Sequence, residues 1–300
     1  MIQQKFFKVE VEHNKEKWFV YAPSSVEEPF DHTVMFVTER FTERWTDLLS
    51  VSHCLIFWPM KCQIAQELEQ RHHIVACKNP RLEYARFFRK NHIQNLPQNG
   101  SAVLTNGSYI ADGSRIGSDV TIMPGAYIGQ EVMIGSSVYI GSGVRLIGKI
   151  KIGSNVVIRE NTVLGADGLS MEREEDGRMI PIPQFGGVCV DDNVSIGANV
   201  TIARGAIDDT VIGKGSMIDN NCFISHNVKI GENVGIVGET ILFGSVRVGK
   251  NSFISGNTAV RDGRSIGEHA LVGMGGVVTK DVQDHTVVMG NPAGPLLERV

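Results

Sequence analysis

Ile134-Gly-Ser-Ser-Val-Tyr139 and Ile140-Gly-Ser-Gly-Val-Arg145 are two successive copies of one six-residue pattern. A large aliphatic residue opens each copy, glycine often follows it, and a small or β-branched residue stands four places further on. The opening aliphatic recurs from Ile110 to Leu164 and again from Ile212 to Val278. A period of six differs from the 3.6 residues of an α-helix and from the two residues of a strand. Short fixed periods of this kind predict a solenoid.

A triangular coil accounts for this pattern, because each six-residue side then carries two inward residues and a turn. Three sides make about 18 residues per coil, so residues eighteen apart are expected to lie one above another. Strands of successive coils would pair about 4.8 Å apart and bury the aliphatic ladder. We therefore expect a mainly β fold: a parallel β-helix of about nine coils, roughly 40 Å tall, with a small α/β domain before it.

Composition describes an ordinary globular chain. With 300 residues and 42% hydrophobic residues, it can bury a sizeable core. A net charge of −4 without a basic run provides no electrostatic footprint for nucleic acid. No segment has the length and apolarity of a membrane span and the N-terminus has no apolar signal region, so a cytoplasmic location is expected. The five scattered cysteines indicate neither a disulfide framework nor a thiolate zinc site.

The N-terminal third differs from the repeat. Strands are predicted at Phe6–Val11 and Trp18–Ala22, joined by a polar turn. Short apolar runs at 34–37, 54–57 and 74–77 alternate with helical spacing at 45–49, 64–68 and 80–90, which predicts a small α/β domain. The expected boundaries are 1–92 for this domain, 93–108 for a linker, 109–284 for the β-helix with a loop at 169–189, and 285–300 for a C-terminal cap.

The repeat is interrupted twice. From Leu169 to Cys189 it gives way to a charged, proline-bearing loop, and loops ejected from a rigid scaffold commonly carry specificity. At Ile207–Ile212 the aliphatic phase slips from a step of six to a shorter one. We expect this slip to shorten one corner and to dent a flat face.

His226 is the histidine that lies deep in the regular repeat with no evident structural duty. Gly244 follows eighteen residues later, so it is expected one coil above, where it leaves space and an accessible N–H beside the imidazole. Acyl transfer needs a base that works near neutral pH and a preorganised N–H for the oxyanion. From the residues alone, a solvated or structural histidine remains the alternative.

Several strings resemble known repeats. Ile196-Gly-Ala-Asn-Val-Thr201 and the two copies quoted first resemble those of the hexapeptide-repeat acyltransferases, whose solenoids wind left-handed, against the usual right-handed crossover. Longer strings resemble the UDP-3-O-(3-hydroxyacyl)glucosamine N-acyltransferases of lipid A synthesis. These are Gly165-Ala-Asp-Gly168, Ile182-Pro-Gln-Phe-Gly186, Arg204-Gly-Ala-Ile-Asp-Asp-Thr-Val-Ile-Gly213 and Ile218-Asp-Asn-Asn-Cys-Phe-Ile-Ser-His-Asn-Val-Lys-Ile-Gly-Glu-Asn233. Lys78–Phe88 resembles the end of their nucleotide-binding N-terminal domain.

This resemblance implies roles for particular residues. His226 would be the general base, Asp219 its carboxylate partner and Gly244 the oxyanion-hole amide. Substrate contacts would come from Phe36, Gln184, Phe185 and Asn227. The resemblance also implies a homotrimer with active sites between adjacent prisms, and acyl transfer to a nucleotide-linked amino sugar. It implies no metal and no resident cofactor; the co-substrate would be a thioester of acyl carrier protein or of coenzyme A.

The chain also departs from that family. Where the family holds uracil with an aromatic residue, an asparagine and a tyrosine, this chain has Phe36, Glu39 and Thr42. Phe223 replaces a glutamine, and Gly263 replaces a second histidine. The ending Gly290–Val300 resembles that of small sugar acetyltransferases. These differences leave the nucleotide, the acyl length and the choice of acyl carrier open.

Three alternative functions are compared with this sequence. A γ-class carbonic anhydrase shares this solenoid, but His226, His269 and His285 are too scattered to form a zinc site. An acetyl-CoA-dependent sugar acetyltransferase would use the same base. A non-catalytic sugar-nucleotide-binding or structural β-helix is the third reading. Turnover that depends on His226 would distinguish an enzyme from a binding protein, whose ligand affinity would not depend on this residue.

Overall fold

The computed structural model describes residues 5–13, 16–95 and 102–295. The chain divides into two compact units: Met1–Leu96 with Leu169–Phe185, and Pro97–Gly168 with Gly186–Val300. Residues 96–101 of the predicted linker and 296–300 of the predicted cap lie outside the described residues. None of the helices in the described part of the chain combines the length and apolarity needed to cross a bilayer.

The first unit is built on a parallel sheet ordered β3 (Ala22–Pro23), β4 (Thr33–Phe36), β5 (Leu55–Pro59), β6 (His73–Cys77). The three predicted apolar runs form β4, β5 and β6, and every residue of the central strand β5 is buried. The connecting helices are η1 (Glu39–Ser50), α1 (Gln66–Arg71) and α2 (Pro80–Lys90). Asn79 starts α2 by accepting a hydrogen bond from Leu82 N at 3.0 Å.

The two N-terminal strands form a separate antiparallel hairpin of β1 (Val9–His13) and β2 (Glu16–Val20). Both strands were predicted, but β1 begins three residues later than expected. The N–H groups of Phe6 and Phe7 instead both donate to Tyr21 O, at 2.9 and 3.1 Å, and the two rings pack edge-on against Phe185. Two amides on one carbonyl do not continue the regular ladder at this end.

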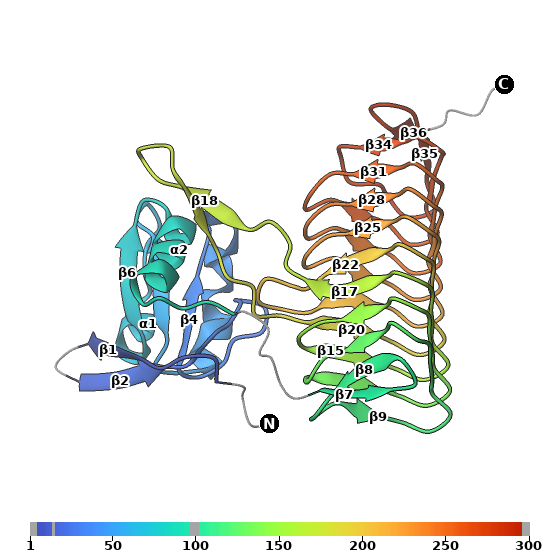
Figure 1. Cartoon of the computed structure of the whole chain (residues 1–300). Helices are drawn as coiled ribbons and strands as arrows, with labels where there is room; N and C mark the ends of the chain where they lie inside the picture. Colours follow the sequence, from blue (N-terminus) through green and yellow to red (C-terminus); the bar gives the residue numbers. More distant parts are fainter. Residues whose placement is uncertain (1–4, 14–15, 96–101, 296–300) are drawn as a thin grey trace. The chain divides into compact units, whose positions relative to one another are not determined.

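The first interruption of the repeat is an antiparallel hairpin of β18 (Met171–Arg173) and β19 (Met179–Pro181). It belongs to the first unit, where it lies beside α2 (Figure 1). Glu172 accepts from Arg81 at 2.6 Å, and Glu174 pairs with Arg89 at 2.8 Å. The sequence boundaries placed 169–189 in the β-helix. The structure groups Leu169–Phe185 with the first unit because charged and aromatic partners for these residues lie there.

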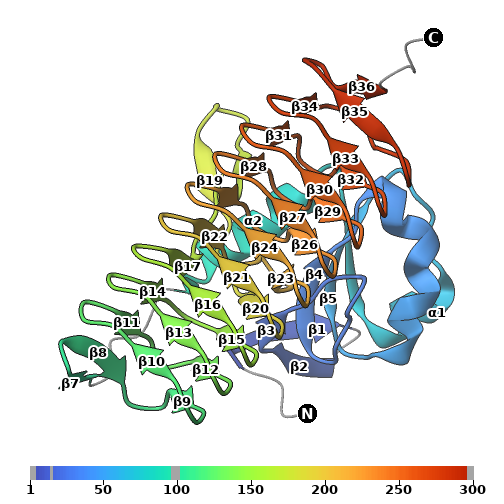
Figure 2. The ribbon, with the colours of Figure 1, turned by 90° about the vertical axis from the view of Figure 1, so that its right-hand side faces the viewer.

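The second unit is a left-handed parallel β-helix, whose coils are stacked in sequence order (Figures 1 and 2). Its three sheets form the sides of a prism, which we call faces 1, 2 and 3. Face 1 consists of β10 (Thr121–Ile122), β13 (Tyr139–Ile140), β16 (Val157–Ile158), β21 (Ser195–Ile196), β24 (Met217–Ile218), β27 (Gly235–Ile236), β30 (Phe253–Ile254), β33 (Leu271–Val272), β35 (Val287–Met289) and β36 (Gly294–Pro295).

Faces 2 and 3 complete each coil. Face 2 consists of β7 (Ala102–Thr105), β8 (Ser108–Ala111), β11 (Tyr127–Ile128), β14 (Arg145–Leu146), β17 (Val163–Ala166), β22 (Thr201–Ala203), β25 (Phe223–Ile224), β28 (Ile241–Leu242), β31 (Ala259–Val260) and β34 (Val277–Val278). Face 3 consists of β9 (Arg115–Ile116), β12 (Val132–Ile134), β15 (Ile150–Ile152), β20 (Val188–Val190), β23 (Thr210–Ile212), β26 (Lys229–Ile230), β29 (Arg247–Val248) and β32 (Ser265–Ile266).

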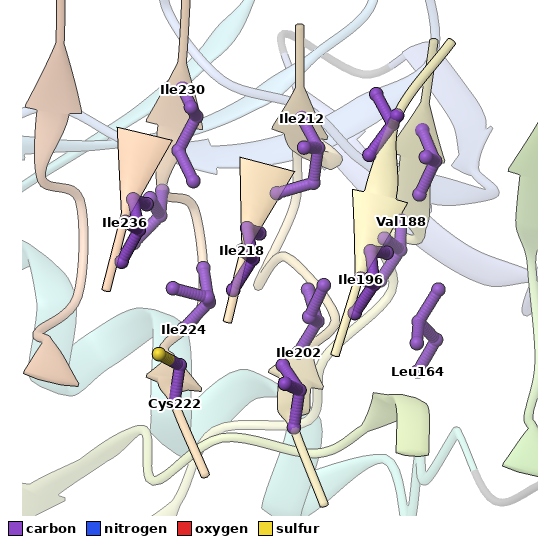
Figure 3. Close-up of a cluster of buried hydrophobic side chains, with 14 of the residues drawn as sticks. Leu164, Val188, Ile196, Ile202, Ile212, Ile218, Cys222, Ile224, Ile230 and Ile236 are labelled. Atoms are coloured by element: carbon purple, nitrogen blue, oxygen red, sulfur yellow. The ribbon is translucent and has the colours of Figure 1, made fainter. Parts of the chain in front are cut away.

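The aliphatic ladder forms the core of the prism. Ile128 stacks on Leu146 and Ile140 on Ile158, each pair eighteen residues apart as the period predicted. All four side chains are fully buried. Figure 3 shows the same arrangement higher up, where Ile196, Ile202 and Ile212 point inward from three strands. Full burial of one such side chain is worth about 1.5–3 kcal/mol, so the stack forms a rigid support for residues on its corners.

The corners turn through left-handed backbone, which asparagine tolerates better than most residues. The corner asparagines with positive φ are Asn155, Asn161, Asn193, Asn199, Asn221, Asn227, Asn233, Asn251 and Asn257. The second interruption differs from its prediction. Ile202 pairs with Ile224, so this coil is longer than the regular eighteen residues. Ile207 is only half-buried and does not join the ladder; the corner is therefore extended rather than shortened.

Candidate active site

His226 lies just after β25, at the corner between faces 2 and 3, and its side chain is half-buried. Gly244 stands at the same corner one coil on. A Cβ at Gly244 would lie 2.7 Å from Cε1 and 2.8 Å from Nε2 of the imidazole. On the other edge of the ring, a Cβ at Gly168 would lie 2.9 Å from Cδ2. The imidazole therefore occupies a slot between two positions that must be glycine.

Asn227 determines which ring nitrogen carries the proton. Its Oδ1 accepts a hydrogen bond from the Ala206 N–H at 3.0 Å and lies 3.0 Å from Nδ1 of His226. Because a backbone N–H can only donate, the side-chain atom that it meets must be the oxygen. Nδ1 of His226 must then donate as well, which leaves the lone pair of the neutral ring on Nε2, on the edge beside Gly244. This is the tautomer that a general base requires.

The backbone beside that lone pair has an N–H group, that of Gly244, which can donate a hydrogen bond. In the described parts of the chain, the N–H of Gly244 makes no hydrogen bond, whereas the next amide, Ser245 N, donates to His226 O at 2.9 Å. A free N–H held by a rigid coil matches the requirement for oxyanion stabilisation. The structure thus places Gly244 where the spacing predicted, and its catalytic role stays a prediction.

Asp219 does not meet His226 within one chain. It is exposed and follows β24 at the corner between faces 1 and 2, a full side of the coil away. Its Oδ1 accepts from Asn220 N at 2.8 Å and its Oδ2 from Gly238 N at 3.2 Å. Asp219 also lines a depression on face 1 with Arg159, Met217 and Phe253. Within one chain, Asn227 rather than Asp219 lies beside Nδ1 of His226, and the role of Asp219 as a carboxylate partner stays a prediction.

The four predicted substrate contacts have different surroundings. Phe36 ends β4, is half-buried, and lies 5.0 Å from the ring of Tyr84. Gln184 and Phe185 are 1% and 3% exposed and pack inside the first unit. Asn227 is engaged by His226 and Ala206. The structure therefore supports packing for Gln184 and Phe185 and positioning for Asn227. Phe36 is half-buried, so part of its ring remains accessible beside Tyr84.

Two charged residues below His226 escaped the sequence analysis, although both stood in quoted motifs. Arg204 is 3% exposed, and its Nη1 lies 3.8 Å from Oδ1 of Asp167. Burial raises the pKa of the Asp167 carboxyl, and Arg204 opposes this shift only in part. Burial also lowers the pKa of the Arg204 guanidinium. For both groups, the effect of burial on the pKa thus exceeds the opposing effect of the partner's charge.

The described residues contain no group of three histidine, cysteine or acidic side chains placed to hold a metal ion. Burial raises the pKa of Cys77 to about 11, and it also raises the pKa of the Cys54 and Cys222 thiols. A raised pKa lowers the thiolate fraction and so makes these thiols weaker nucleophiles than an ordinary cysteine.

Comparison with known proteins agrees with this fold. Residues 107–142 and 131–166 match the model of the bacterial transferase hexapeptide family (six repeats). The UDP-3-O-acylglucosamine N-acyltransferase of Coxiella burnetii (strain Dugway 5J108-111) is 48% identical over 89 residues, covering 30% of this chain and 26% of that protein. A protein of the same name from Francisella tularensis subsp. holarctica (strain FTNF002-00 / FTA) is 51% identical over 79 residues, covering 26% of this chain and 23% of that protein.

Solved structures give the same answer for the fold. A UDP-N-acetylglucosamine acyltransferase from Bacteroides fragilis 9343 superposes with a TM-score of 0.58 at 22% identity, covering 65% of this chain and 74% of that chain. The corresponding enzyme from Campylobacter jejuni gives 0.58 at 23% identity, covering 64% and 73%. The chain spans about a quarter of the length of the curated relatives quoted above. Its second unit is a hexapeptide-repeat β-helix of the kind found in these acyltransferases.

Proposed function

We propose that this protein is an N-acyltransferase that moves an acyl group from a thioester to the amine of a nucleotide-linked amino sugar. One observation carries the proposal: Nδ1 of His226 is held by Asn227, so the Nε2 lone pair lies beside the glycine amide of the next coil. The names of the two curated relatives support the acceptor, since both are UDP-3-O-acylglucosamine N-acyltransferases.

The proposed chemistry follows from these positions. The acceptor amine attacks the thioester carbonyl carbon, and Nε2 of His226 takes the proton that the nitrogen releases. The carbonyl oxygen becomes an oxyanion, which accepts a hydrogen bond from the Gly244 N–H. The C–S bond then breaks, and the leaving thiolate takes the proton from the imidazolium. The products are an amide and a free thiol, and the ring returns to its starting tautomer.

The substrates are proposed at the level of chemical class. We place the nucleotide on the first unit at the end of β4, where Phe36 offers an aromatic face for a base. The Thr42 hydroxyl donates a hydrogen bond to Glu39 O at 2.8 Å. Glu39 and Thr42 thus provide a carboxylate and an already bonded hydroxyl, where the family has an amide and a phenol. The donor is a thioester of acyl carrier protein or of coenzyme A, and the acyl group is 3-hydroxyacyl in the family that the sequence resembles.

Product analysis tests this function. Purified protein is incubated with UDP-linked amino sugars, each with acyl-CoA or acylated carrier protein of several chain lengths, and amide products are identified by mass spectrometry. We expect one acceptor class to be acylated by the wild type and not by His226→Ala. Tight binding of a sugar nucleotide that is unchanged in His226→Ala, with no amide formed from any pair, would replace the enzyme by a binding protein.

We further propose that the protein is a homotrimer with each active site between two chains. The outward residues stacked on face 1 carry no charge: Thr121, Tyr139, Val157, Ser195, Met217, Gly235, Phe253, Leu271 and Val287. Met217 and Phe253 are 64% and 46% exposed. By contrast, face 3 presents the basic residues Arg115, Lys151, Lys229 and Arg247. Exposed apolar faces favour contacts between copies, and head-to-tail contacts of this kind close into rings.

Such a ring would explain why Asp219 and His226 lie at different corners. We propose that the Asp219 corner of one chain approaches the His226 corner of the next. Trimers mixed from His226→Ala and Asp219→Ala chains then test the arrangement. If each site takes one residue from each of two chains, roughly a quarter of the sites recover both residues in a random mixture. Sedimentation showing a monomer at micromolar concentration, or no recovered turnover on mixing, would refute it.

A further inference from the structure

Arg204 holds the most unusual charged position in the second unit. It follows β22, one coil below His226 on the same corner, and it is 3% exposed. Nε donates to Gly186 O at 2.8 Å, and Nη1 lies 3.8 Å from Oδ1 of Asp167. The guanidinium rests on Gly148, where a Cβ would lie 3.3 Å from either Nη atom. Burying a guanidinium is costly, so its position among these contacts needs an explanation.

The two partners of its side chain, Asp167 and Gly186, lie on the two stems of the inserted hairpin. Asp167 lies just before the point where the chain leaves the coil, and Gly186 lies where it returns. The backbone repeats the same connection, because Arg204 N donates to Ala166 O at 2.9 Å and Gly205 N donates to Gly187 O at 3.1 Å. Arg204 and the glycine after it therefore bind the outgoing and the returning stem together.

The bound stems lead directly to His226. Gly168 closes the outgoing stem and lies against the Cδ2 edge of the imidazole. Ala206 is two residues after Arg204, and its N–H holds Oδ1 of Asn227, which in turn accepts from Nδ1 of the ring. Both supports of the imidazole on this side thus depend on backbone that Arg204 fixes.

We propose that Arg204 is a positioning residue for the acyl transfer: by bonding both stems of the inserted hairpin, it keeps Gly168 and Ala206 where they hold the His226 ring. This inference rests on the proposed function for its kinetic consequence. Its structural consequence, the fixed orientation and tautomer of the ring, can be measured without turnover.

Stability alone does not explain the charged pair. Burial disfavours the charged form of both Arg204 and Asp167. Only the Arg204 end of the pair is buried, because the Asp167 side chain is 54% exposed. Ion pairs open to water contribute little to stability, whereas loss of Asp167 alone would leave the buried guanidinium without its opposite charge. The double variant Arg204→Met with Asp167→Asn therefore separates positioning from folding, even if Arg204→Met alone fails to fold.

The experiment compares wild type, this double variant and Arg178→Met, a matched control. Arg178 is a 67% exposed arginine of the hairpin that pairs with Asp176. Each protein is examined by thermal unfolding, by steady-state kinetics, and by ¹⁵N NMR of labelled histidine, with His226 assigned from its loss in His226→Ala. We expect the double variant to melt within a few degrees of wild type and to lose about 10²-fold in kcat with little change in either KM, because a displaced base loses its alignment. The ¹⁵N shifts of His226 should move from the Nδ1–H tautomer towards an average of both.

Unchanged ¹⁵N shifts, or an unchanged kcat, in the folded double variant would overturn the inference. A kcat loss that Arg178→Met reproduces would also overturn it. If the wild type acylates nothing, the proposed function fails, yet the histidine spectra still decide whether Arg204 holds the ring.

Discussion

Glycine has different roles in the regular coils and in the interrupted coil. In the regular coils, glycine admits the backbone of the next coil: a Cβ at Gly135 would lie 2.6 Å from Gly153 O. Around the interruption, the same lack of a side chain admits the ring of His226 between Gly168 and Gly244. Close stacking is thus the general property of this prism. The candidate active site lies where one of the closely stacked groups is an imidazole.

The two regions also differ in what holds them together. The regular coils depend on buried aliphatic side chains, and their corner asparagines serve the turn. The interrupted coil instead depends on polar contacts, in which Asn227, Ala206 and Arg204 form a continuous set with His226. We therefore expect substitutions in the regular coils to cost stability and substitutions around the interruption to cost turnover.

The largest effect is expected for His226→Ala, which should reduce turnover by about 10²- to 10⁴-fold through loss of the general base. The fold should survive, because the ladder residues Ile224 and Ile230 fill the coil without the imidazole. His269→Asn is the matched control, since it removes an exposed imidazole from another corner. Steady-state rates and melting temperatures of the three proteins decide the point. Near-normal turnover in His226→Ala would show that the active site does not lie at the interrupted coil.

Ile140→Ala should have the opposite signature. Ile140 is fully buried in the regular ladder, so truncation should lower the free energy of unfolding by about 2–5 kcal/mol. The rate per folded molecule should stay at the wild-type value. Denaturant unfolding and kinetics below the melting temperature measure both quantities, with the outward Lys151→Ala as control. A specific loss of kcat in folded Ile140→Ala would erase the distinction between the two regions.

Gly244→Ala tests the slot. The added Cβ would meet Cε1 of His226 at 2.7 Å, so the ring must move, and a displacement of about 1 Å can cost roughly 10²-fold in rate. Gly294→Ala is the control, because a Cβ there has no neighbour within 4 Å. Turnover is compared with melting temperature for both variants. If Gly244→Ala remains as fast as wild type, the imidazole does not work from this position.

Asn227→Gly removes the hydrogen bond to Nδ1 together with the one from Ala206 N. Glycine preserves the φ of +62° at this corner, so the expected loss is one of ring orientation, about 10-fold in kcat as part of the general-base contribution. Asn233→Gly changes a corner asparagine with a φ of +54° that does not contact His226. Rates of the two variants should differ by that factor. Equal rates would show that the asparagine serves the turn alone.

The smallest effect is expected for Glu174→Gln in the hairpin. Arg86 donates hydrogen bonds to Glu174 and lowers the pKa of this carboxyl below its ordinary value. A lowered native pKa means that the unfolded state binds the proton more tightly, so this ion pair stabilises the fold at neutral pH and loses its effect on acidification. Glu174→Gln should melt slightly earlier than wild type at pH 7, and the gap should close as the pH falls from the ordinary pKa of glutamate through the lowered native pKa. The exposed Glu175→Gln should show no such pH-dependent gap in thermal unfolding; a constant gap for Glu174→Gln would mean that charge is not its cause.

Local pattern was enough for the coil. The six-residue period predicted the inward ladder, the eighteen-residue register and the position of Gly244 over His226, because each depends on residues close in sequence or at a fixed spacing. The apolar runs of the N-terminal third likewise predicted strands, which form β4, β5 and β6. The same reasoning misplaced the start of β1, where two amides share Tyr21 O, and the length of the corner after Ile202, where Ile207 does not join the ladder.

Sequence by itself thus determined the β-helix and the glycine one coil above His226. Only the tertiary structure decided that Phe185 and the hairpin join the first unit, that Asn227 rather than Asp219 holds the imidazole, and that Arg204 binds both stems of the insertion. The physical reason is that a periodic coil is set by neighbours at fixed spacing, whereas these contacts join segments whose separation in sequence follows no period.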